Sequence, residues 1–108
     1  MITNDDIEVY TEGDCFVLAQ AVHEITGWPM CAFSYDNTPD LHAFVMTPDG
    51  KYLDIEGKHT PKQLRKKWQC GLDINEYTVD EFKLWGEPNY DIGGERAREL
   101  AQHLIETT

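Results

Sequence analysis

The sequence predicts an α+β fold, and three observations support this prediction. Residues 14–27 and 94–105 carry apolar side chains at helical spacing. Between these two stretches, residues 41–47 and 51–56 flank Thr47-Pro48-Asp49-Gly50, whose composition is typical of a hairpin turn. Helices at both ends of the chain and a small antiparallel sheet between them indicate an architecture in which helices pack on a sheet.

The stretch from residue 14 to residue 27 is expected to be the central helix. Asp14 suits the N-cap, and Gly27 supplies the left-handed residue that commonly ends a helix. The positions that recur at helical spacing form an apolar stripe of Cys15, Leu18, Ala19, Val22 and Ile25. Cys15 therefore lies in the first turn, where the positive end of the helix dipole favours a thiolate.

The other elements follow from turn and capping signals. We expect a short helix over 3–11, a strand over 30–35, a loop over 36–40, and an edge strand over 72–77. Thr60-Pro61 predicts the start of a helix that ends at Gly71. Thr78 and Glu81 form a capping box for a short helix ending at Gly86, followed by a loop over 87–92 and a last helix from near Gly94.

The predicted hairpin fixes which side chains share a face of the sheet. A three-residue loop pairs Thr47 with Lys51, and it places Phe44 opposite Asp54. One face then carries His42, Phe44, Met46, Tyr52, Asp54 and Glu56, with His42 opposite Glu56, and the other carries Ala43, Val45, Leu53 and Ile55. Both faces hold apolar residues, so we expect both to be covered. A two-residue loop would instead turn His42 and Asp54 to opposite faces.

Composition bounds the class of protein. A chain of 108 residues forms one domain, residues 1–108, and 41% hydrophobic residues argue against disorder. The net charge of −11 disfavours direct nucleic-acid binding, although five of the nine basic residues fall within 58–67. Three cysteines at irregular spacing, no signal-peptide pattern and no apolar run of membrane length predict a cytoplasmic protein without membrane contact. The oligomeric state stays open.

Three residues have the chemistry of an activated nucleophile. Cys15 opens a helix, His42 lies on one strand of the hairpin, and Asp54 lies on the other. A histidine that takes the thiol proton, held by a carboxylate, is the general arrangement of nucleophilic catalysis. Glu56 is the alternative third member. The same residues suit zinc, but no fourth ligand is evident, so we expect neither a metal nor another cofactor.

A cysteine opening a central helix, followed by His and then Asp on adjacent strands, resembles the papain-like and transglutaminase-like superfamily of cysteine enzymes. Strings such as Gly13-Asp14-Cys15, His42-Ala43-Phe44-Val45 and the run from Thr47 to Gly57 are also similar to small bacterial or phage proteins of unassigned function. The resemblance covers residues 13–57. It implies a papain-like domain with a catalytic Cys15–His42–Asp54 triad.

The resemblance also implies an activity. Members of the superfamily are peptidases, amidases, deamidases and transferases, so the implied reaction is acyl transfer through a thioester on Cys15. The substrate would be a protein or peptide-like amide or thioester. These enzymes usually supply a Gln upstream of the cysteine for the oxyanion; none precedes Cys15, and Asn4 and Tyr10 are the candidates in its place.

A second function belongs to a different class: a non-catalytic, acidic binding protein or inhibitor on the same scaffold. The remaining candidate residues are assigned to ordinary roles. We expect His23 and His59 at the surface, His103 without a partner, and packing positions for Cys31 and Cys70. Trp28 and Tyr35 are expected in the core or, alternatively, lining a cleft after the Cys15 helix.

Overall fold

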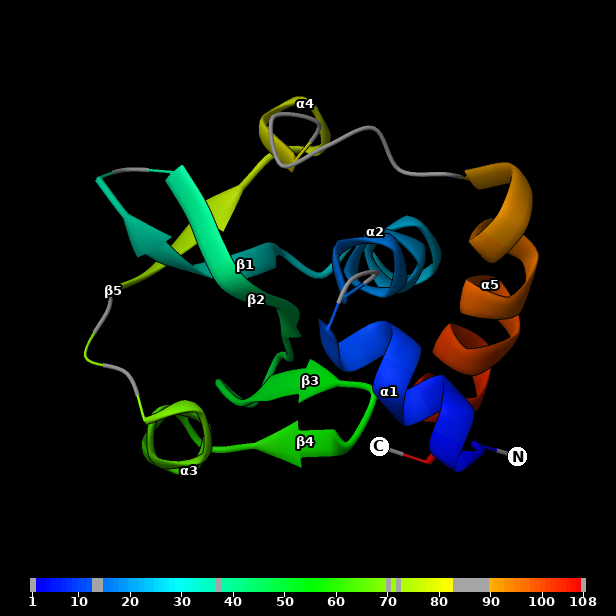
Figure 1. The fold of residues 1–108 in the computed structure, drawn as a ribbon, viewed down its shortest axis with the longest axis horizontal. Helices are drawn as coiled ribbons and strands as arrows, with labels where there is room; N and C mark the ends of the chain where they lie inside the picture. The colour runs from blue at the N-terminus through cyan, green and yellow to red at the C-terminus, as the bar shows by residue number, and fades with distance from the viewer. Residues whose placement is uncertain are drawn as a thin grey trace.

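The computed structural model confirms the α+β fold and describes residues 2–12, 15–36, 38–69, 71, 73–82 and 90–107. Its sheet is antiparallel, with the strand order β4-β3-β2-β1-β5 (Figure 1). The described elements are α1 (Asn4–Glu12), α2 (Cys15–Thr26), β1 (Met30–Tyr35), β2 (Thr38–Met46), β3 (Tyr52–Asp54), β4 (Gly57–His59), α3 (Pro61–Trp68), β5 (Asp73–Tyr77), α4 (Val79–Phe82) and α5 (Tyr90–Glu106).

Each face of the sheet has its own apolar cluster. The larger cluster joins α2 and α5 to one face through Ala32, Ala43, Val45 and Leu53. The smaller cluster lies on the opposite face, where Leu64 of α3 packs with Cys31, Phe33 and Phe44. Figure 1 shows α2 beside α5 and shows α3 at a separate place, next to β4. The prediction that both faces are covered is confirmed.

The central hairpin has the predicted register. The Thr47 N–H donates to the Lys51 carbonyl at 2.8 Å, and Gly50, with a φ of 79°, closes the three-residue loop. Val45 then pairs with Leu53, and Met46 pairs with Tyr52. The turn therefore places the even-numbered side chains of β2, among them His42, on the α3 face of the sheet.

A bulge interrupts the pairing of β1 with β2. Ala32 pairs with Ala43, but the next residue of β1, Phe33, pairs with Asp40. Two extra residues of β2, at positions 41 and 42, lie within this interruption. Because two residues are added rather than one, the alternation of faces is the same on both sides of the bulge.

The end of α2 and the starts of α3 and α4 follow the predicted capping signals. Gly27, with a φ of 76°, follows α2, and its N–H donates to the His23 carbonyl at 2.7 Å. Thr60 and Gln63 form a full capping box at the start of α3. Thr78 and Glu81 form the reciprocal bonds expected before α4. The predicted N-cap Asp14 lies outside the described residues.

Several predicted boundaries are wrong, and one strand was not predicted. β2 begins at Thr38, within the expected loop, and α5 begins at Tyr90 rather than near Gly94. α3 ends at Trp68, because Gln69 takes the left-handed conformation expected of Gly71. Strand β4 was not expected, since only three residues form it and they show no apolar alternation. The predicted end of α4 at Gly86 lies outside the described residues.

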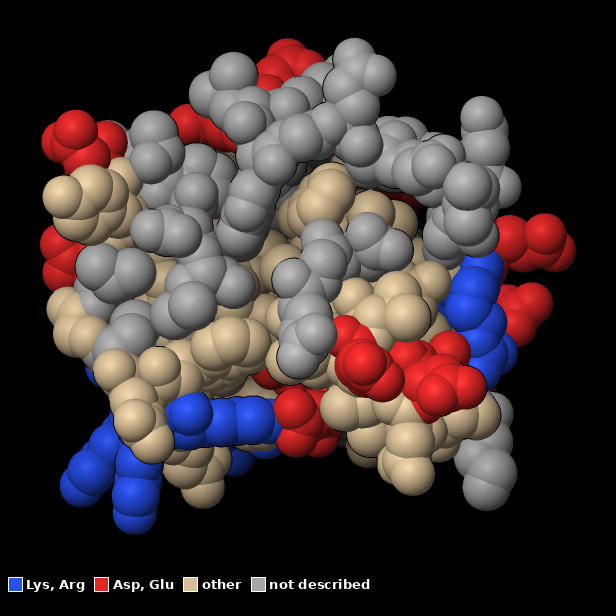
Figure 2. All heavy atoms as spheres, in the orientation of Figure 1, with Lys and Arg blue, Asp and Glu red and all other residues tan. Residues whose placement is uncertain are grey.

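Basic side chains gather in one main region of the surface, with a smaller group beside α5 (Figure 2). In Figure 2, Lys and Arg side chains gather at the lower left, over α3. Residues 58–67 supply the main group. Lys58 forms an ion pair with Asp49 at 3.0 Å, and Lys67 forms one with Glu56. Asp6 of α1 pairs with Arg96 of α5, joining two helices that are distant in the sequence. No helix in the described part of the chain is long and apolar enough to cross a bilayer.

Candidate functional site

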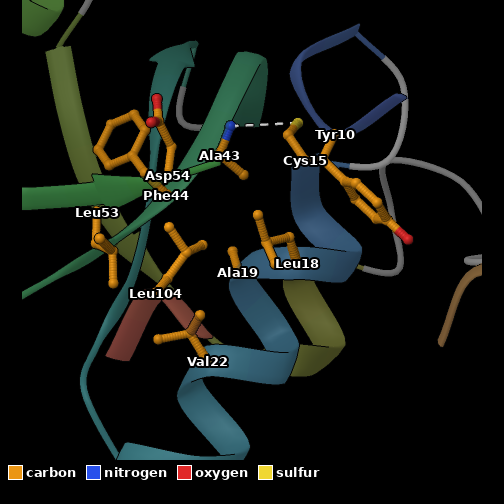
Figure 3. Close-up of a pocket in the computed structure, with 10 residues that line it drawn as sticks. All are labelled: Tyr10, Cys15, Leu18, Ala19, Val22, Ala43, Phe44, Leu53, Asp54 and Leu104. Carbon is orange, nitrogen blue, oxygen red and sulfur yellow. Dashed lines mark hydrogen bonds between the residues drawn. The ribbon is translucent and has the colours of Figure 1, made fainter. Parts of the chain in front are cut away.

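Cys15 is the first residue of α2, and its side chain points toward strand β2 (Figure 3). The sulfur accepts a hydrogen bond from the Ala43 N–H, with 3.4 Å between N and Sγ. A backbone donor of this kind stabilises a thiolate relative to a thiol. The side chain is nonetheless enclosed, because Cys15 is only 5% exposed and belongs to the cluster between α2 and the sheet.

His42 and Asp54 form a buried pair, as the hairpin register predicts. His42 Nε2 lies 2.9 Å from Asp54 Oδ2, and His42 is fully buried. Because an ionised carboxylate only accepts hydrogen bonds, Nε2 carries the proton of this bond. In the neutral imidazole, Nδ1 is then the basic nitrogen. Nδ1 is also buried, and it has no hydrogen-bond partner among the described residues.

Asp54 binds a second histidine, which the sequence did not predict. Its other oxygen, Oδ1, accepts from His59 Nε2 at 3.0 Å and from the Glu56 N–H at 2.9 Å. The expectation that His59 is an ordinary surface residue is wrong. Asp54-Ile55-Glu56-Gly57 carries Asp at the first position and Gly at the fourth, a type I turn signature that marks the entry to β4. Because this turn leads into the short strand that carries His59, it is the sequence feature that could have placed His59 near Asp54.

The shared carboxylate has a distinct electrostatic state. Burial alone would raise the pKa of Asp54, but the hydrogen bonds from His42 and His59 outweigh it and hold this pKa well below its usual range. The same contact raises the pKa of His59; burial and Lys67 oppose this shift, and Glu56 adds to it. Asp54 is therefore ionised at all pH values near neutrality.

Aromatic rings enclose the imidazole of His42. The Trp68 ring of α3 stacks on it, with ring centroids 4.4 Å apart and planes inclined by 23°. Phe44 lies on the same face of β2, with its centroid 5.8 Å away. The contact of Trp68 with His42 depends on how α3 docks on the sheet.

The alternative third member, Glu56, does not contact His42. Strand β3 ends at Asp54, so Glu56 lies in a turn and is not paired opposite His42 as predicted. Its carboxylate forms an ion pair with Lys67 instead. Asp54 is therefore the carboxylate that holds the imidazole.

The structure thus joins two of the three predicted site residues directly. His42 and Asp54 are hydrogen-bonded, whereas the Cys15 sulfur contacts the main chain of the residue next to His42. The sulfur belongs to the α2 side of the sheet, and the imidazole stacks on Trp68 of α3. The sequence also allowed zinc binding by Cys15, His42 and Asp54. Among the described residues, however, these side chains do not form a cluster suited to a metal ion.

A narrow pocket lies between Cys15 and the sheet (Figure 3). Its lining includes Tyr10, Cys15, Ala43, Phe44 and Asp54, so the thiol and the carboxylate border the same space. The pocket is too tight to hold a water molecule. Tyr10, a candidate for the oxyanion, is buried in this lining, whereas the other candidate, Asn4, opens α1.

The other candidate residues have ordinary surroundings. His23 Nδ1 lies 2.7 Å from the Trp28 carbonyl, and His103 is exposed on α5. Cys31 is a buried packing residue, as expected, and burial with nearby Glu76 raises its pKa to about 11. Tyr35 is not a core residue, because it is 65% exposed at the end of β1. Cys70 lies outside the described residues.

No family model, no curated protein and no solved structure matches this chain.

Proposed function

We propose that this protein is a cysteine-dependent acyl-transfer enzyme of the papain-like and transglutaminase-like type. Cys15 would be the nucleophile, His42 the general base and acid, and Asp54 the residue that orients His42. One observation carries the proposal: a buried His42–Asp54 pair, with Nδ1 left without a partner, adjoins the strand residue that contacts the Cys15 sulfur. Few buried polar atoms in native structures lack a hydrogen-bond partner, and a catalytic role is one of the explanations for such an atom.

The proposed chemistry assigns a step to each group. The Cys15 thiol proton passes to His42 Nδ1, and Sγ forms a bond to the carbonyl carbon of the substrate. His42 returns the proton to the leaving amine or thiol as its bond to that carbon breaks, which leaves a thioester. Water or an amine then attacks the thioester and regenerates the thiol. Asp54 stays ionised throughout and stabilises the imidazolium.

The first step needs the sulfur within reach of Nδ1. A separation of about 3–4 Å is required for the proton transfer. In the structure, the sulfur accepts a hydrogen bond from the N–H of Ala43, the residue that follows His42. Because the sulfur belongs to the α2 side of the sheet and the imidazole stacks on Trp68, the step requires the imidazole to leave Trp68 and turn past β2 toward the sulfur. Contacts of catalytic groups often tighten only when substrate binds.

The substrate class follows from the reaction. A thioester mechanism suits a protein or peptide-like amide or a thioester, and it needs no cofactor. Cys15 and Cys31 are free thiols, and such thiols fit a reducing compartment, so we place the protein in the cytoplasm.

Selective alkylation of Cys15 tests the proposal. The folded protein is treated with iodoacetamide at pH 7, and each cysteine is quantified by mass spectrometry over time. Cys31, with a pKa of about 11, is a thiolate in about one molecule in ten thousand at this pH. Cys15 should react at least about tenfold faster than Cys31 and Cys70, because its proton can pass to His42.

Two variants control this experiment. His42→Gln should slow the alkylation of Cys15 without changing that of the other cysteines, whereas Cys31→Ala should leave the rate at Cys15 unchanged. Equal rates at all three cysteines in the folded wild-type protein would reject the enzyme proposal.

A non-catalytic, acidic binding protein is the second candidate function. Burial favours it, since Cys15 is 5% exposed, His42 is fully buried, and the pocket between Cys15 and the sheet excludes water. The net charge of −11 would suit a basic partner. In that case the function should persist in Cys15→Ala and should fall when acidic surface residues are replaced by lysine.

A further inference from the structure

The Asp54 carboxylate is the centre of a three-residue unit. It accepts from His42 at one oxygen and from His59 at the other, at 2.9 and 3.0 Å. The unit runs outward from the fully buried His42, through Asp54, to His59, whose side chain is 18% exposed. A catalytic pair needs only the inner bond, so the outer histidine requires its own explanation.

Transfer of a proton through the unit is unfavourable. A proton that moved from His42 to His59 would have to reside on Asp54 along the way. The two hydrogen bonds hold the pKa of that carboxyl well below its usual range, so the neutral acid is a high-energy state. The role left for His59 is to hold the carboxylate in place.

Geometry supports this positioning role. His59 lies on β4 opposite Tyr52, and the adjoining turn supplies the Glu56 N–H to the same oxygen, Oδ1. Two donors on Oδ1 fix the rotation of the carboxyl group. With Oδ1 held by β4 and its turn, Oδ2 is directed at His42 Nε2. Residues that hydrogen-bond a functional side chain from behind commonly set the orientation of that side chain.

We infer that His59 is a positioning residue, which holds Asp54 so that its carboxylate fixes the ring orientation and tautomer of His42. The inference rests on the proposed function for its catalytic meaning. Its structural content, the dependence of the His42–Asp54 bond on His59, is measurable without any activity.

The test is the ring N–H signal of His42 in the NMR spectrum of the ¹⁵N-labelled protein. In the wild type, this ring proton is buried and donates a hydrogen bond to the Asp54 carboxylate, so it should exchange slowly with solvent and resonate downfield. His59→Ala should raise its exchange rate by about tenfold or abolish the signal, since one hydrogen bond to a charged group is lost. His59→Gln, whose amide N–H can still donate to Oδ1, should retain the signal.

Matched variants separate positioning from simple damage to the fold. Lys58→Ala, on the same strand but paired with Asp49, should leave the signal unchanged. His59→Leu, which keeps side-chain volume without the hydrogen bond, replaces the alanine variant if that variant does not fold. An unchanged His42 signal in His59→Ala or His59→Leu overturns the inference, as does an equal loss in His59→Gln.

Alkylation of Cys15, measured on the same samples, tests the proposed function separately. If Cys15 shows no preference over Cys31 while the His42 signal still depends on His59, the proposed enzyme fails and the positioning role stands. If Cys15 reacts selectively and the signal is independent of His59, the enzyme proposal stands and this inference fails.

Discussion

Asp54 is the residue on which the candidate site depends most strongly. It is buried and ionised, and such a carboxylate is tolerated only where hydrogen bonds replace its lost hydration. Two imidazoles and one backbone N–H do so here. The benefit is reciprocal, because the carboxylate in turn favours the charged form of His59.

The raised pKa of His59 predicts how stability depends on pH. A group whose pKa is higher in the folded state stabilises the fold fully below its unfolded pKa, near 6.5 for histidine, and loses this contribution as pH rises through the folded value. The free energy of unfolding of the wild type relative to His59→Gln should therefore be largest near pH 6 and should fall with rising pH. Urea unfolding at a series of pH values from 6 to 9 measures it.

His103→Gln is the matched control for this series, because it removes an exposed histidine from α5 and leaves Asp54 untouched. A wild-type advantage over His59→Gln that grows as pH rises would contradict the assignment.

At the scale of the element, α3 links a local capping signal to the candidate site. Thr60 and Gln63 begin the helix, and eight residues after Thr60 the same helix places Trp68 on His42. Leu64 anchors the middle of the helix in the smaller apolar cluster. The position of Trp68 therefore depends on where α3 begins, and the capping residues Thr60 and Gln63 determine that start.

Removing this cap should destabilise the protein by a measurable amount. Thr60→Ala loses the hydroxyl that accepts from the Gln63 N–H, and it should lower the free energy of unfolding by about 1 kcal/mol. Urea unfolding measures the change. Thr60→Ser, which keeps the hydroxyl, should differ little from the wild type. Equal losses in both variants would assign the effect to the threonine methyl group and not to the cap.

The elements also show where sequence reasoning succeeds. The register of β2 and β3 was predictable, because Thr47-Pro48-Asp49-Gly50 determines it within four residues. That register placed His42 and Asp54 on one face. The contacts of His42 with Trp68 and of Asp54 with His59 were not predictable from pattern, since the first depends on helix docking and the second on a strand of three residues.

At the scale of the whole molecule, charge is the dominant property. Twenty acidic and nine basic residues give the net charge of −11, and five of the basic ones lie within 58–67. Acidic residues outnumber basic ones, and repulsion among the excess negative charges opposes the compact folded state. The exposed ion pairs compensate little, because such pairs contribute weakly.

Salt should therefore stabilise this protein. Raising NaCl from about 10 mM to about 150 mM shortens the screening length from about 30 Å to about 8 Å, which weakens the repulsion. We expect the Tm to rise by about 4 °C, which corresponds to about 1 kcal/mol for a domain of this size. Scanning calorimetry measures it, and choline chloride should give the same shift. A Tm that falls with salt would show that attractive pairs outweigh the repulsion.

The pairing of Ala32 with Ala43 beneath α2 has a consequence for how this scaffold can change over evolution. Both residues are fully enclosed, and Ala19 of α2 belongs to the same cluster. Side chains of one methyl group act here as a thin spacer between helix and strand, so the gap between Sγ and the β2 main chain varies with their bulk. A lineage that enlarged either strand residue would move the thiol away from β2 and break its hydrogen bond with the Ala43 N–H.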